Sequence, residues 1–130
     1  MFVKNIRNSP WLSVILLITN FVICRFLLFE LHEMKDWPCN LFLLGFIILL
    51  ISVLLKSRNM PLCISIGYLF SFFVGFVFQK DSFDAGGGTT NNLWLIWTIT
   101  YICVIMLSML CEILIRRHNK KNEKDEDVLN

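Results

Sequence analysis

Charged residues are scarce in this 130-residue chain, and those present are unevenly placed. They make up 17% of the sequence and fall almost entirely between or beyond four apolar stretches. A water-soluble domain needs charges interspersed over its surface, whereas 56% of these residues are hydrophobic and the mean hydropathy is +0.66. The shortage of charge therefore excludes an ordinary soluble globule and indicates that lipid surrounds most of the chain.

Motifs that carry chemistry are missing as well. No run of Lys and Arg is interleaved with aromatic residues, so we expect no nucleic-acid partner. The five cysteines contain no C-x-x-C pair, and Gly86-Gly87-Gly88 lacks the Lys-Ser/Thr of a phosphate loop. His32 and His118 fall on opposite sides of the predicted membrane, which leaves no catalytic arrangement to argue. We therefore expect no metal, no cofactor and no enzyme activity.

The four apolar stretches predict four transmembrane helices, at about 11–29, 37–55, 61–79 and 93–115. Each is close to the ~20 residues that a helix needs to cross the hydrocarbon core. Helix is required because an extended segment in lipid would leave its backbone N–H and C=O groups unpaired. Pro38 and Pro61 stand where helices begin, and Asn91-Asn92 can cap the fourth helix. The predicted fold is all-α, an integral membrane four-helix bundle with antiparallel neighbours and short loops, in a domain at 1–115.

The basic residues predict the orientation of this domain. Nine of the twelve Lys and Arg residues lie in the N-terminal arm, the loop after the second span and the tail, at Lys4, Arg7, Lys56, Arg58, Arg116, Arg117, Lys120, Lys121 and Lys124. The positive-inside rule places these regions, and thus both termini, in the cytoplasm of a multi-pass protein of the cell membrane. The tail at 116–130 has almost nothing to bury, so we predict that it is disordered.

A ridge of small residues marks the third span. Cys63, Gly67, Ser71 and Gly75 recur at intervals of four, so their side chains share one face of a helix. Such a face lets a second helix backbone come close, which is how helices in lipid gain packing contacts. We favour helix packing inside one chain over an oligomer contact. A Gly75→Leu change would abolish folding in the first case and only oligomerisation in the second.

Asn20 lies near the middle of the first span and needs a hydrogen-bond partner. We expect an interhelical polar clamp, with the alternative a transport site. The candidate partners at similar depth on other helices are Ser71, Tyr68, Thr98, Thr100 and Tyr101.

Two charged residues also fall within the predicted spans. Arg25 is near the outer end of the first span, so we expect it to snorkel towards the outer headgroups, towards Glu30 or Glu33, or towards the acidic outer loop. The alternative is an anion or substrate contact inside the bundle. Glu112 precedes Arg116 by four residues, the favourable order for a helical ion pair. The alternative for Glu112 is a proton-coupled carboxylate.

Three functional hypotheses fit this topology. In general dimensions alone the chain resembles accessory and immunity proteins of bacteria, so we expect a non-enzymatic binding or interaction protein. Its partners would be the lipid bilayer and another membrane protein, or a homo-oligomer. A small transporter or channel subunit is the second hypothesis, although small multidrug transporters carry an embedded carboxylate in their first helix and residues 11–29 contain none. A holin-like pore-forming lysis protein is the third.

Overall fold

The computed structural model of the chain describes residues 9–32, 35–57 and 59–130. Helix dominates this described part, and four of its helices are long and apolar enough to cross a membrane. The first consists of α2 and a π-helical turn, η1. The elements in chain order are α2 (Pro10–Val22), η1 (Ile23–Leu27), α3 (Phe29–His32), α4 (Trp37–Leu54), α5 (Met60–Phe78), β1 (Asp81–Phe83), β2 (Thr89–Asn91) and α6 (Leu93–Leu129).

Local signals explain where the long helices begin. A proline occupies one of the first two positions of α2, α4 and α5, where its fixed φ suits a helix and its missing N–H costs no hydrogen bond. At the start of α6, the backbone N–H of Leu93 donates to Asn91 Oδ1 over 2.7 Å. The three earlier helices and the start of α6 lie within two residues of the predicted spans.

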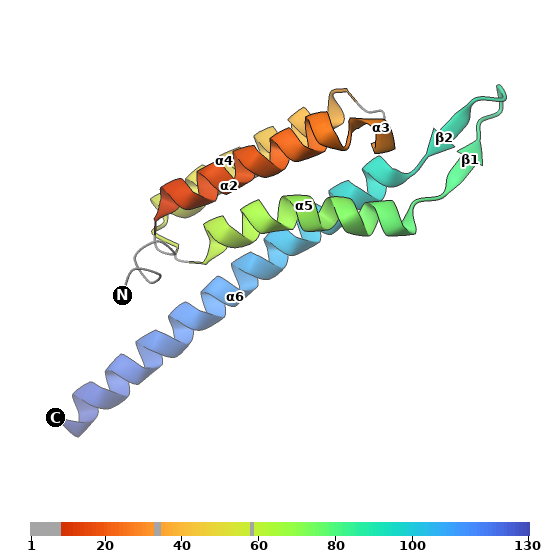
Figure 1. Cartoon of the computed structure of the whole chain (residues 1–130). Helices are drawn as coiled ribbons and strands as arrows, with labels where there is room; N and C mark the ends of the chain where they lie inside the picture. The colour runs from red at the N-terminus through yellow and green to blue at the C-terminus, as the bar shows by residue number, and fades with distance from the viewer. Residues whose placement is uncertain (1–8, 33–34, 58) are drawn as a thin grey trace.

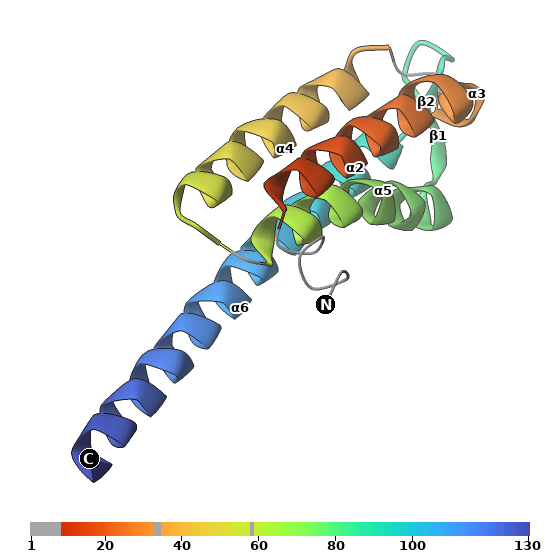
Figure 2. The same ribbon diagram turned by 60° about the vertical axis from the view of Figure 1, so that its left-hand side comes forward.

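Helix α5 lies at the centre of the packing. It contacts α2, α4 and α6, and α2 also contacts α4. Figures 1 and 2 show α2, α4 and α5 running side by side, while α6 crosses α5 and continues well beyond the other helices. Helix α2 begins, and α6 ends, on the same side of the molecule. The hairpin of β1 and β2 projects from the opposite side (Figure 1).

An aromatic cluster from α5 and α6 forms the core. Tyr68, Phe72, Trp97 and Tyr101 are fully buried, and Tyr68 meets the Trp97 and Tyr101 rings edge-to-face at centroid distances of 5.5 and 5.6 Å. Their polar atoms bond to main-chain carbonyls. Tyr68 Oη donates to Pro38 O (2.8 Å), Trp97 Nε1 to Tyr68 O (3.2 Å) and Tyr101 Oη to Ile64 O (3.3 Å). The cluster thus joins α4, α5 and α6, and the side-chain donors of Tyr68, Trp97 and Tyr101 are all hydrogen-bonded.

The tail corrects one expectation. Residues 116–129 continue α6 as helix, although every residue from 116 to 130 is exposed and the composition predicts disorder. A residue does not need to be buried to be helical when it extends a helix that already exists. The apolar part of α6 has already met the free-energy cost of helix nucleation, so each tail residue adds one backbone hydrogen bond without that cost. Lys, Arg and Glu are also good helix formers.

The loop between α5 and α6, which contains Gly86, Gly87 and Gly88, forms a short β-hairpin. Strands β1 and β2 pair antiparallel, with Ser82 opposite Thr90. The turn closes through bonds from Asp84 N to Gly88 O (2.7 Å) and from Gly87 N to Asp84 O (2.9 Å). Gly87 has φ of 83°, a left-handed conformation that glycine adopts without steric cost. This hairpin is a small exception to the all-α prediction.

Candidate functional site

The small-residue ridge of α5 faces α6 over most of its length. A Cβ on Gly75 would lie 3.2 Å from Trp97 N and 3.3 Å from Leu93 O, so the α6 backbone passes directly over this glycine. A Cβ on Gly67 would lie 2.6 Å from Val104 Cγ1. These close approaches occur within one chain, as the packing interpretation requires.

The other two ridge residues behave differently from each other. Ser71 is buried, and its hydroxyl donates to Gly67 O over 2.5 Å, which satisfies the hydroxyl inside its own helix. Cys63 is exposed and lines a groove instead of a tight contact. The ridge therefore serves close packing at Gly67 and Gly75 and widens into open space at Cys63.

Asn20 holds α2 against α5, as part of a buried polar strip. Its Nδ2 donates to Ser65 O over 2.7 Å, and Ser65 Oγ donates in turn towards Ser13 O at 2.6 Å and Pro61 O at 2.9 Å. The partner of Asn20 is the main-chain carbonyl of Ser65 and none of the side chains that we proposed. Sequence patterns miss such a partner because every residue offers a carbonyl.

Arg25 lies in η1, the π-helical turn, and is partly buried. Its guanidinium carbon is 5.3 Å from the centroid of the Phe29 ring and 5.7 Å from that of Phe26, within cation–π range. Among the described residues Arg25 forms no ion pair, and Glu33, an expected partner, lies outside them. The aromatic rings of Phe26 and Phe29 therefore stabilise this cation, and its predicted contact with the outer headgroups stays a prediction.

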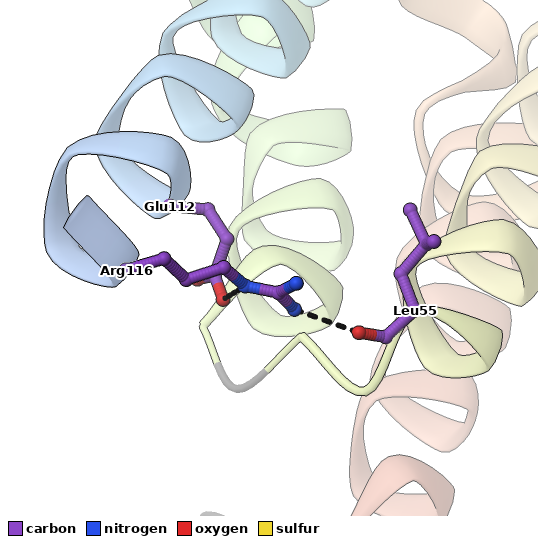
Figure 3. A network of polar contacts seen from close by, with 3 residues as sticks. All are labelled: Leu55, Glu112 and Arg116. Atoms are coloured by element: carbon purple, nitrogen blue, oxygen red, sulfur yellow. Dashed lines mark hydrogen bonds and ion pairs between the residues drawn. The ribbon is translucent and has the colours of Figure 1, made fainter. Parts of the chain in front are cut away.

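Glu112 and Arg116 form the ion pair that their spacing predicts. Arg116 Nε lies 3.1 Å from Glu112 Oε1, and Arg116 Nη2 donates to Leu55 O over 2.7 Å (Figure 3). Leu55 follows the last residue of α4, so the guanidinium joins α6 to the negative end of α4. Glu112 Oε2 is buried and has no hydrogen-bond donor among the described residues.

A groove of about 420 Å³ lies between α5 and α6 next to this ion pair. Its α5 wall includes Asn59, Cys63, Gly67 and Phe70, and its α6 wall includes Val104, Ser108, Cys111 and Ile115, with Glu112 at one end. Among the lining residues that the structure describes, only Asn59, Ser108 and Glu112 have polar side chains. Figure 1 shows α6 crossing α5 and separating from it towards the start of α5, the end at which the groove opens.

No known family, curated protein or solved structure matches this chain. The function must therefore be argued from its own geometry. Within residues 9–32, 35–57 and 59–130, no group of three His, Cys, Asp or Glu side chains is placed to hold a metal ion.

The groove was missed by sequence reasoning, although one of its residues, Cys63, was named for packing. Val104, Ser108 and Cys111 follow a helical spacing on α6 that is typical of any apolar helix face, so nothing distinguished them. Gly45 was missed too, and its α carbon faces the Tyr101 hydroxyl. A lone glycine in an apolar helix was the only available signal.

Proposed function

We propose that this chain is a four-span protein of the cell membrane that acts by binding a hydrophobic partner in the groove between α5 and α6. Membrane insertion is supported by the side chains that the fold leaves uncovered. Large apolar residues are exposed along all four long helices, among them Leu54 (81%), Val77 (72%) and Leu107 (61%). Exposed apolar area on this scale requires lipid or protein to cover it.

The proposed orientation has both termini in the cytoplasm. Lys56, between α4 and α5, and the basic first half of the tail are exposed on one side, whereas the hairpin with Asp81 and Asp84 is on the other. Lys4, Arg7 and Arg58, which also support this orientation, lie outside the described residues. Helix α6 is about 55 Å long against a hydrocarbon core of ~30 Å, so its charged end would extend into the cytoplasm.

The groove is the observation that carries the binding role. The buried polar side chains already form hydrogen bonds inside the protein, which leaves them less available to a ligand. Those that donate to main-chain carbonyls are Asn20, Ser65, Tyr68, Trp97 and Tyr101. The groove, in contrast, is an apolar concavity that residues 9–32, 35–57 and 59–130 leave open. Binding by shape and apolar contact is what such a concavity supports best.

Photo-crosslinking from the groove tests this role. An amino acid with a small aliphatic diazirine, which leaves the groove open, would replace Cys111, which lines the groove, or Cys103, which is exposed on α6 and does not line it. The protein is extracted from membranes, washed in detergent to remove loosely held molecules, and irradiated. We expect a discrete adduct from position 111 and none from position 103. Equal labelling from both positions, or none from 111, would contradict the proposal.

A further inference from the structure

The dimensions of the groove between α5 and α6 restrict its occupant. Its walls run from Asn59, which precedes α5, to Phe70 and from Val104 to Ile115 on α6. Each wall has twelve residues, and the eleven helical rises between the first and the last make the groove about 16 Å long. With a volume of about 420 Å³, its mean cross-section is about 26 Å². A helix with its side chains is about 10 Å across, so it could cover the open side of the groove but not enter between its walls. A single extended hydrocarbon chain is narrow enough.

The depth of the groove matches one leaflet of a bilayer. One end lies at Asn59 and Ile115, at the edge of the predicted membrane next to the cytoplasmic loop and tail, and the other lies at Phe70 and Val104, near the middle of α5 and of the spanning part of α6. Half of a ~30 Å hydrocarbon core is about 15 Å. An acyl chain of the cytoplasmic leaflet would therefore fill the groove from end to end.

The cytoplasmic mouth of the groove favours an anionic head. Arg116 has its side chain 51% exposed, and it uses Nε for Glu112 and Nη2 for Leu55 O, so guanidinium N–H groups stay open. Lys56 is exposed beside Leu55, and no side chain caps the N-terminus of α5 at Asn59. Glu112 pairs with Arg116 through Oε1 (Figure 3), so the charges of these two side chains balance and Lys56 supplies the net positive charge next to this end of the groove.

We infer that the groove is a phospholipid site of the cytoplasmic leaflet, with one acyl chain between α5 and α6 and the phosphate at Arg116. Basic pockets at the cytoplasmic ends of membrane helices bind anionic headgroups in this way. The acyl chain gains contact along two helix faces, and the phosphate gains a charge-assisted hydrogen bond. This inference rests on the proposed binding role of the groove and names the partner.

Native mass spectrometry of the full chain tests the inference. The protein is reconstituted into vesicles of phosphatidylglycerol and phosphatidylethanolamine, extracted and washed in detergent, and the lipid retained per chain is measured. We expect one phospholipid per chain. Cys63→Phe, which fills the groove from its wall, should abolish retention, whereas Cys103→Phe adds the same side chain outside the groove and should leave it unchanged.

The headgroup contact is tested separately. Arg116→Gln should lower retention of phosphatidylglycerol about tenfold, the effect of losing one charge-assisted hydrogen bond. Lys124→Gln removes an equal charge from the distant tail and should have no effect. Retention that is unaffected by Cys63→Phe, or equally reduced by both charge changes, overturns the lipid assignment.

The lipid assignment can fail without the binding role. If irradiation from position 111 links the chain to a protein or to a second copy of itself, the binding role stands and the lipid assignment is wrong. If position 111 yields no adduct, the proposed function fails together with the lipid assignment.

Discussion

Gly67 and Val104 provide the sharpest residue-scale test of how α5 and α6 pack. A methyl group at position 67 would lie 2.6 Å from Val104 Cγ1, and the β-branched valine has little freedom to turn away. We predict that Gly67→Ala destabilises the protein by about 1–3 kcal/mol through overpacking. Val104→Ala removes the obstructing group, so the double variant should be more stable than the two single effects predict. Thermal unfolding in detergent, run as a double-mutant cycle, measures this coupling.

Additive effects in that cycle would show that Gly67 does not face Val104. The matched comparison is Gly86→Ala, because a Cβ at Gly86 meets nothing within 4 Å and should cost little.

Asn20 gives a second residue-scale prediction. Asn20→Leu removes the donor to Ser65 O, and we expect a loss of about 0.6 kcal/mol, with about 1.7 kcal/mol as the upper range for bonds between membrane helices. Thr19→Val is the control, since the exposed Thr19 hydroxyl bonds only to Ile15 O in its own helix. If the melting temperature falls no further for Asn20→Leu than for the control, the clamp between α2 and α5 is not formed.

Sequence reasoning at this scale identified the positions and missed the partners. The spacing of four correctly placed Gly67 and Gly75 on one face, but it could not show that Cys63, on the same face, opens into a groove. That difference depends on the crossing of α6 over α5, which brings the α6 backbone within reach of Gly75 and leaves room at Cys63.

The Glu112–Arg116 pair was predictable because both residues belong to one helix. The bond from Arg116 to Leu55 joins residues 61 apart in the sequence, and no local pattern predicts it.

At the scale of elements, the charged half of α6 depends on the apolar half for its nucleus. Three glycines inserted after Ile115 should uncouple the two, because a separate helix of fewer than about 12–15 residues is marginal in water. We predict that residues 118–129 then lose the Cα chemical shifts of helix in NMR spectra of the detergent-solubilised chain. The same glycines inserted after Leu129 should change nothing. Helical shifts that survive the first insertion would refute this dependence.

The hairpin depends on a single left-handed residue. Gly87→Val places a β-branched side chain at a φ of 83°, which costs about 1–2 kcal/mol. An isolated two-stranded hairpin is only marginally stable, so a cost of this size is enough to open it. We therefore expect faster amide exchange across the Ser82–Thr90 pair, while Gly86→Val, where φ is not in the left-handed region, leaves exchange nearly unchanged.

Element boundaries were the most predictable part of this chain, because hydropathy and the prolines mark them in the local sequence. The tail helix and the hairpin were not predictable by the same reasoning. The tail is helical because it continues the apolar part of α6 and not because it is buried. The hairpin depends on a turn in which Gly87 adopts a left-handed conformation that other residues rarely adopt. The π-helical turn at Arg25 likewise has no signal in the apolar pattern of the first span.

For the whole molecule, α5 lies at the centre of the packing and α6 extends beyond the other helices. Helix α5 contacts the three other long helices, and α6 departs from it at the groove before extending as a charged helix. The proposed membrane account places the hairpin outside the cell, and it places the groove mouth, the Arg116 contact and the tail on the cytoplasmic side. Every functional inference depends on that arrangement.

Site-directed thiol labelling in intact cells tests this arrangement most directly. In a chain whose five cysteines are replaced by serine, Ser82→Cys reports on the hairpin and Asn122→Cys on the tail, both at exposed positions. With a maleimide that does not cross membranes, the account predicts labelling at position 82 in intact cells and labelling at position 122 only after the cells are opened. Labelling at position 122 in intact cells, or recovery of the chain in the detergent-free soluble fraction, would contradict it.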